Sequence, residues 1–191
     1  MPQLESGASR LDDAFQKRMP DPEDLNAMTH ESLKAAFAGE SQAAEKYIVF
    51  AEQAEDEGLP NIARLFRAIS YAETRHARNH FRVMGGVGTT ADNLKVAFDG
   101  ESFEIDEMYP AYQEIAKVQQ NRQAGRTIKY ALKAEQDHKV MYASARESAL
   151  KGEDVADDPV SVCLICGHTV IGDVPEKCPV CAAARQYYRT F

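Results

Sequence analysis

The chain has 191 residues, of which 44% are hydrophobic, and a formal net charge of −8. This length allows one well-packed domain plus a small appendage. The negative charge argues against a surface that binds nucleic acid or an anionic membrane. No apolar run approaches the roughly 20 residues that a membrane-spanning helix needs.

The N-terminal stretch, residues 1–28, is polar, contains three prolines and has few periodic apolar positions. We expect a loose arm here. The stretch has no apolar segment of the kind that a signal peptide requires, so we expect a cytoplasmic protein.

Four long helices are expected next, because Leu, Ala, Glu, Lys and Gln dominate the following sequence while Pro and Gly are sparse. Thr29 is the expected N-cap of the first helix. Turns are expected at GLPN (58–61) and at GGVGTT (85–90). The predicted helices are Thr29 to about Glu57, Ile62 to Met84, Ala91 to Gln120 and Ala124 to Ala149.

Beyond the helices, the composition changes twice. An acidic linker at 151–159 separates the helical part, 29–150, from a cysteine-rich module at 160–191. The sequence therefore predicts a mainly α-helical bundle followed by a small metal-binding module.

The helical part contains an internal duplication. AFAGES at 36–41 returns as AFDGES at 97–102, an offset of 61, and RLFRAISYAETRH at 64–76 aligns with RTIKYALKAEQDH at 126–138, an offset of 62. A repeated two-helix unit indicates that neither half buries its apolar face alone.

Each predicted helix carries carboxylates within its apolar stripe. A single such glutamate is usually a rim residue that reaches water, and a single histidine is usually a satisfied core residue. Five carboxylates in one bundle core would repel one another and resist desolvation unless cations neutralised them. The five are Glu40, Glu73, Glu101, Glu104 and Glu135.

The spacing indicates which cations fit. Glu73-x-x-His76 and Glu135-x-x-His138 each place a carboxylate and an imidazole on one helical face. One Glu from each of two helices, with Glu-x-x-His from each of the other two, is the pattern of di-iron and di-manganese carboxylate proteins. Such an oxygen-rich donor set favours iron or manganese over structural zinc.

The four cysteines form two knuckles, Cys163-x-x-Cys166 and Cys178-x-x-Cys181. This spacing suits a tetrahedral metal site better than disulfides. It fits a zinc ribbon as well as an Fe(Cys)₄ centre. The neighbouring di-iron pattern favours iron, because a one-electron relay is useful beside a two-electron site, while zinc stays possible.

The chain resembles rubrerythrin over 30–191. The shared motifs are FAGES, Y-A-E-x-x-H-A, GE-x-x-E-x-x-EMYP, A-E-x-x-H and C-x-x-C-G…C-P-x-C. The resemblance implies a ferritin-like four-helix bundle with a C-terminal rubredoxin-like domain. It also implies a non-haem di-iron peroxidase that reduces hydrogen peroxide to water in oxidative stress defence, with electrons entering through the Fe(Cys)₄ centre from rubredoxin or an NAD(P)H-dependent reductase.

The resemblance further implies a role for each metal ligand. Glu73 and Glu135 would bridge the two irons. Glu40 would be a terminal ligand on one iron, and Glu101 with His138 on the other.

Four more residues match positions that matter in the family. Glu104 is the family's extra carboxylate, at a position where the first half has Ala43, and in relatives it exchanges with His76 on the first iron upon reduction. Tyr47 and Tyr109 match the family's site tyrosines, whose hydroxyls could orient carboxylates. Both tyrosines could equally be ordinary core residues.

The connection at 85–90 sets a condition on how the bundle assembles. In a ferritin-like bundle the second and third helices are parallel, so their connection must travel about 30 Å back along the bundle. Six residues span about 24 Å when fully stretched. We therefore predict a dimer in which each bundle takes its first two helices from one chain and its last two from the other. An up-down-up-down bundle is the alternative.

Dimerisation is expected in either case to bring one chain's Fe(Cys)₄ module close to the partner's di-iron site. Two other functional classes stay open. One is a ferroxidase or small iron store, and the other is a zinc or mixed-metal structural protein without turnover.

Overall fold

The computed structural model describes residues 25–191. The expected N-terminal arm lies outside the described residues, apart from 25–28. The chain divides into two compact units, one ending at Val87 and the other spanning Gly88–Phe191. Each unit is described by itself. Among the described residues, no helix is long and apolar enough to cross a membrane.

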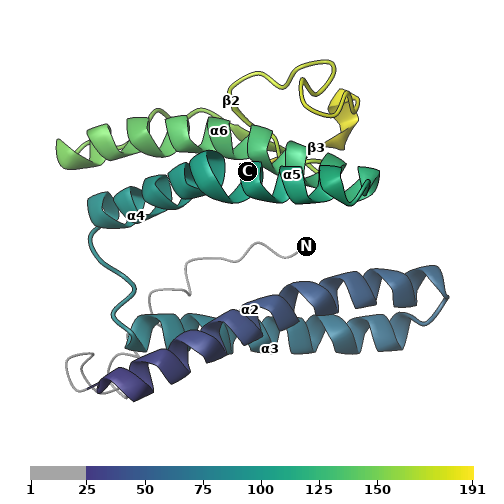
Figure 1. The fold of residues 1–191 in the computed structure, drawn as a ribbon, viewed down its shortest axis with the longest axis horizontal. Helices are drawn as coiled ribbons and strands as arrows, with labels where there is room; N and C mark the ends of the chain where they lie inside the picture. Colours follow the sequence, from purple (N-terminus) through teal and green to yellow (C-terminus); the bar gives the residue numbers. More distant parts are fainter. Residues whose placement is uncertain (1–24) are drawn as a thin grey trace. The chain divides into compact units, whose positions relative to one another are not determined.

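The first unit is a pair of long helices, α2 (Ala27–Asp56) and α3 (Pro60–Val83), joined by a short turn (Figure 1). The expected N-cap at Thr29 is wrong. Asn26 is the cap, and its side chain accepts a hydrogen bond from the backbone N–H of Thr29. Both residue types can cap a helix, and the earlier one leaves Thr29 inside the first turn.

Small side chains line the contact between α2 and α3. Ser70 Oγ donates a buried hydrogen bond of 2.9 Å to the carbonyl oxygen of Ala44, which ties the two backbones together. With so little side-chain volume between them, the two helices approach closely. The buried residues of this seam are Ala44, Ala51, Ala54, Ala63, Ser70 and Ala77.

The second unit begins with a helix that is interrupted. The sequence predicts one helix from Ala91 to Gln120, but the structure has a π-helical turn, η2, in the middle. The second unit ends with one long helix and a small sheet. The helical elements are α4 (Thr90–Phe103), η2 (Glu104–Met108), α5 (Tyr109–Val118) and α6 (Arg122–Leu150).

The π turn explains the change of offset within the duplication. The backbone N–H of Tyr109 bonds to the carbonyl of Glu104, five residues back, instead of the usual four. This wider turn accommodates one extra residue, and Pro110 directly after it has no N–H to place in an α-helical ladder. The offset of 61 before the turn therefore becomes 62 after it.

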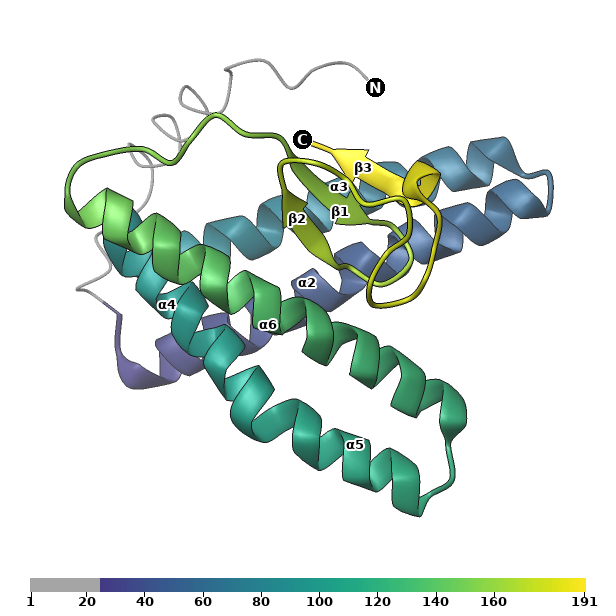
Figure 2. The ribbon, with the colours of Figure 1, turned by 90° about the horizontal axis from the view of Figure 1, so that it is seen from above.

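The cysteine module is a three-stranded antiparallel sheet with the order β2-β1-β3. Its strands are β1 (Val160–Cys163), β2 (Thr169–Ile171) and β3 (Tyr188–Thr190). A 3₁₀ turn, η3 (Arg185–Tyr187), leads into β3. Strand β2 contacts α6, so the module and this long helix belong to the same unit (Figure 2).

Candidate metal centres

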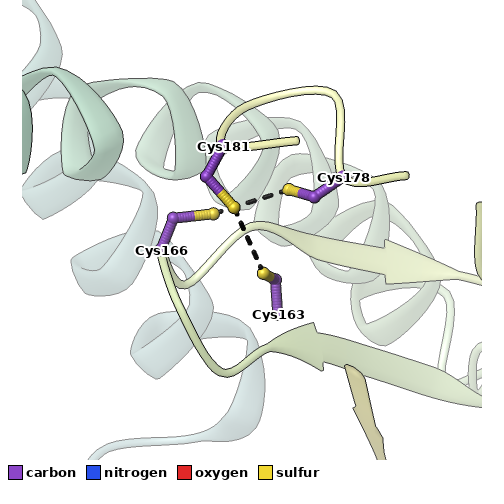
Figure 3. Close-up of side chains that lie close together, drawn as sticks. All are labelled: Cys163, Cys166, Cys178 and Cys181. Atoms are coloured by element: carbon purple, nitrogen blue, oxygen red, sulfur yellow. Dashed lines mark hydrogen bonds between the residues drawn. The ribbon is translucent and has the colours of Figure 1, made fainter. Parts of the chain in front are cut away.

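The four cysteines converge at one point of the module (Figure 3). The Sγ atoms of Cys163 and Cys181 are 3.7 Å apart, and those of Cys166 and Cys178 are 3.6 Å apart. A disulfide would bring two sulfurs to about 2.05 Å, so all four cysteines are unbridged. A metal with bonds of about 2.3 Å to sulfur would hold tetrahedral ligands about 3.8 Å apart. The spacing therefore fits a tetrahedral metal ion.

The protonation of these thiols also prepares the site for a metal. Burial works against ionisation of Cys178, but hydrogen bonds from the Tyr188 hydroxyl and from the backbone of Cys181 and Val180 outweigh it and lower the pKa to about 6. Burial raises the pKa of Cys166 far above its usual value. One thiolate is thus available at neutral pH, and a metal would replace the protons on the others.

In the first unit, Glu40 from α2 meets Glu73 and His76 from α3. Nδ1 of His76 lies 2.9 Å from Oε2 of Glu73 and 4.0 Å from Oε1 of Glu40. The ligand atoms of all three lie within 4.8 Å of one another, as metal ligands must. The prediction that the Glu-x-x-His spacing places a carboxylate and an imidazole together is confirmed, because both side chains leave the same face of α3.

The second unit repeats this arrangement with Glu101 from α4 and with Glu135 and His138 from α6. Nδ1 of His138 lies 2.6 Å from Oε2 of Glu135 and 4.0 Å from Oε1 of Glu101. These three ligand atoms also lie within 4.8 Å of one another. The internal duplication is therefore a duplication of metal-ligand geometry.

The second cluster is under electrostatic strain that a cation would relieve. Burial and the neighbouring Glu135 carboxylate raise the pKa of Glu101 to about 7. The hydrogen bond from His138 lowers the pKa of Glu135, and the same bond raises the pKa of His138. A proton on Glu101 thus does what a metal ion would do, which is to neutralise crowded carboxylates. The donor set fits the hard cations expected from the sequence.

Glu104 and the two tyrosines have different surroundings. Glu104 begins η2, and burial together with the charge on Glu135 raises its pKa. Burial and the charges of Glu104, Glu135 and Glu101 raise the pKa of Tyr109, so this tyrosine faces the second cluster. Tyr47 packs its ring against Phe66 at 6.2 Å between ring centroids. The role of both tyrosines stays a prediction.

Three residues of the module make contacts that the sequence does not predict. Thr169 Oγ1 lies 2.8 Å from Nε2 of His138. His168 is buried and shares a 2.7 Å hydrogen bond with the Tyr188 hydroxyl. Nothing in their spacing links them to the clusters, because the contact depends on how the module folds back onto α6.

These features define the class of protein. Two carboxylate–histidine clusters on paired helices, in one chain with a four-cysteine site, are typical of a metal-dependent oxidoreductase.

Comparisons with known proteins identify the family. Residues 31–146 match the family model for rubrerythrin, and residues 162–189 match that for the rubrerythrin, rubredoxin-like domain. Rubrerythrin-2 of Clostridium acetobutylicum is 40% identical over 87% of this chain and 98% of its own length. Nigerythrin of Nitratidesulfovibrio vulgaris is 32% identical over 85% of this chain and 86% of its own.

A solved structure, of nigerythrin in a mixed-valence state, is similar with a TM-score of 0.51 and 29% identity. The match covers 91% of this chain and 98% of that one. The chain belongs to the rubrerythrin family. The expected ferritin-like fold with a rubredoxin-like domain is thereby confirmed, as are the expected di-iron and four-cysteine cofactor sites of the family.

Proposed function

We propose that this protein is a peroxidase that reduces hydrogen peroxide to water, taking part in oxidative stress defence in the cytoplasm. One observation carries the proposal. A single chain holds two matching carboxylate–histidine clusters and a four-cysteine site whose module contacts the helix of the second cluster. An iron store would need no attached electron inlet, and a purely structural protein would need no cluster of glutamates.

The chain's own residues would supply ligands and protons. When bound, an iron pair would provide the electrons and Lewis acidity that cleave the O–O bond, and a four-cysteine iron would pass electrons to it one at a time. Reduction of one hydrogen peroxide to two waters consumes two electrons and two protons. Glu104 and Tyr109 lie beside the second cluster, where burial and the charge of neighbouring carboxylates raise the pKa of both groups. Their protons could be delivered to the departing oxygen.

We further propose that the two clusters combine into one binuclear site. Each cluster offers two carboxylates and one imidazole, which is half of the ligand set of the family pattern. Glu73 and Glu135 would then bridge the two metals, with Glu40 and Glu101 as terminal ligands.

The connection between the units supports an exchange of helix pairs between two chains. The backbone N–H groups of Gly85 and Gly86 bond back to the carbonyls of Arg82 and Phe81 at the end of α3. Gly88 is likewise bonded to Asn93 at the start of α4. Few residues are therefore free to extend, and the reach of the connection is even less than its length suggests. In such a dimer each module would serve a site that takes one half from each chain.

Complementation tests the exchange. One variant carries Glu40→Ala with Glu73→Ala, and the other carries Glu101→Ala with Glu135→Ala. In an exchanged heterodimer, one bundle receives both intact halves and regains a metal pair, while the other receives both damaged halves. If each chain forms its own bundle, no heterodimer contains an intact site. Co-expression with two different tags and metal analysis of the doubly tagged species therefore distinguishes the two arrangements.

The reaction itself is tested by oxidising the fully reduced protein separately with hydrogen peroxide and with dioxygen. Stopped-flow absorbance should show fast oxidation by peroxide and slow oxidation by dioxygen. The opposite order would contradict the peroxidase and support a ferroxidase. Steady-state turnover with rubredoxin or an NAD(P)H-dependent reductase as donor should then require the four-cysteine metal to be iron, because zinc cannot change its oxidation state.

A further inference from the structure

The four-cysteine module contacts a metal-ligand side chain of its own chain. Thr169, the first residue of β2, places Oγ1 2.8 Å from Nε2 of His138 on α6. We propose that Thr169 is a positioning residue of the binuclear site, whose hydroxyl determines which ring nitrogen of His138 holds the metal. The proposal uses the assignment of His138 as a metal ligand, but it does not depend on which reaction the site performs.

The direction of this hydrogen bond follows from counting protons. A threonine hydroxyl has one proton to donate. Thr169 Oγ1 donates that proton to the carbonyl oxygen of Gly167 at 3.1 Å. With that bond made, the hydroxyl is left to accept from a protonated Nε2 of His138, which is the direction that the proposal takes. A nitrogen that keeps its proton cannot bind a metal, so Nδ1, which bonds to Glu135 in this structure, would give up its proton and become the ligand atom.

The position of Nδ1 agrees with this assignment. Nδ1 lies 2.6 Å from Oε2 of Glu135 and 4.0 Å from Oε1 of Glu101, so it faces the carboxylates with which it would share a metal. The hydrogen bond from Nε2 also fixes the rotation of the ring about its bond to Cβ. Partners of this kind orient metal-ligating histidines and strengthen their binding.

A second contact holds the module in register on α6. Asp137, next to His138, lies 3.6 Å from Nε2 of His168, next to Thr169. The other ring nitrogen of His168 is within 2.7 Å of the Tyr188 hydroxyl. Two consecutive residues of α6 thus meet two consecutive residues of the module. This pairing makes the Thr169 contact a built feature of the fold rather than an isolated one.

The first cluster has no equivalent of this contact. Within residues 25–191, no hydrogen bond is found to Nε2 of His76. Its side chain is 55% exposed, against 26% for that of His138. The same Glu-x-x-His geometry is therefore held by the module in one half of the duplication and by its own helix alone in the other.

The choice of variant depends on a cavity beside the contact. A space of about 540 Å³ is lined by both His138 and Thr169. In Thr169→Ala, water from this space could replace the lost hydroxyl. Thr169→Val keeps the volume of threonine, offers no acceptor and leaves no room for that water. Thr169→Ser keeps the hydroxyl, and Thr127→Val is a matched control on an exposed position of α6.

The experiment uses the full chain with Zn²⁺ in the four-cysteine site and Mn²⁺ as the probe metal. Mn²⁺ prefers oxygen and imidazole ligands, and its free concentration is read by EPR. Loss of a histidine's outer hydrogen-bond partner typically weakens metal binding about tenfold to a hundredfold. We expect that loss in Thr169→Val, and near wild-type affinity in Thr169→Ser and Thr127→Val.

NMR of the ¹⁵N-labelled wild type provides a readout that needs no variant. With a diamagnetic metal such as Zn²⁺ also in the carboxylate–histidine site, the remaining ring proton of His138 should be on Nε2 and should exchange slowly with water. The proposal is overturned if that proton is on Nδ1, if Thr169→Val binds Mn²⁺ as the wild type does, or if Thr169→Ser is weakened as much as Thr169→Val. None of these measurements uses peroxide, so their failure would leave the peroxidase proposal standing.

Discussion

The two helix pairs carry the same metal-ligand geometry on different supports. In α2 and α3, the glutamates and histidine stand on helices whose buried contact is made of small side chains, with aromatic rings such as Phe66 packed beside it. In the second pair, the equivalent ligands gain a π turn on one side and the four-cysteine module on the other. The distances from imidazole to carboxylate nevertheless match within a few tenths of an ångström.

The spacing of Glu and His along the helices is therefore enough to form the cluster. The pKa values of its carboxyl groups depend on the residues that surround it. The side chain of Glu101 is 15% exposed and that of Glu40 is 31% exposed. In the second pair, burial and neighbouring charge raise the pKa of Glu101 to about 7. The duplicated sequence thus produced one cluster that is relatively open and one that the four-cysteine module contacts.

The largest effect is expected from removing either of the two carboxylates that we propose as bridges between the metals. If the two clusters form one site, Glu73→Ala and Glu135→Ala should each weaken the binding of both metals of the pair by at least about a hundredfold. The reason is that a buried metal pair is not stable when one of the carboxylates that balance its charge is removed. Elemental analysis and native mass spectrometry should show only the four-cysteine metal. Glu45→Ala on the exposed side of α2 is the control. Loss of just one metal per variant would mean that the clusters act separately.

A smaller effect is expected from deleting one residue of the π turn. Deletion of Asp106 should convert η2 to regular α-helix and leave the apolar face of α5 packed on α6, because the π turn takes up the one extra residue that the deletion removes. We expect the midpoint of thermal unfolding to fall by less than about 10 °C, as measured by calorimetry, because the packing of α5 on α6 is kept. Asp106→Asn separates the loss of the residue from the loss of its 3.7 Å ion pair with Lys139. A much larger fall in the deletion variant would show that α5 loses its register on α6, and that the π turn does not simply absorb one extra residue.

The smallest effect concerns the stability of the metal-free protein. The pKa of Glu101 is about 7 in the folded state against 4.5 for the model carboxyl. Between these values the folded state binds more protons than the unfolded state, so stability falls as pH rises through the window, and the penalty is complete above pH 7.

Glu101→Gln should therefore stabilise the metal-free protein at pH 8 and have little effect at pH 4. After allowance for solvent screening we expect about 1–2 kcal/mol, or roughly 2–6 °C in the unfolding midpoint. Glu40→Gln should give a smaller change, because that carboxylate is more exposed. Equal gains in the two variants, or a gain for Glu101→Gln that does not depend on pH, would remove the electrostatic difference between the helix pairs.

Much of this arrangement could be predicted from the sequence. Helix periodicity and the Glu-x-x-His spacing act over one or two turns, so they place the clusters without knowledge of the tertiary structure. The spacing of the cysteines is similarly local. The cap at Asn26 was missed because Thr29 is an equally suitable cap three residues later.

The π turn and the Thr169 contact were missed for different reasons. The change of offset from 61 to 62 is visible in the sequence and locates one extra residue, but it does not say that the helix absorbs it as a π turn rather than a break. Thr169 and His138 are 31 residues apart, and no local pattern indicates that they meet. Contacts of that kind are set by the docking of whole elements.

The central claim is that the two clusters close on one pair of metal ions. X-ray absorption at the iron edge tests it most directly, with Zn²⁺ in the four-cysteine site so that only the carboxylate–histidine irons are seen. Metals in such binuclear sites are about 3.5–4 Å apart, and we predict an iron–iron scattering contribution in that range. Iron bound at full occupancy with only oxygen and nitrogen neighbours, and no second iron within this distance, would contradict the claim.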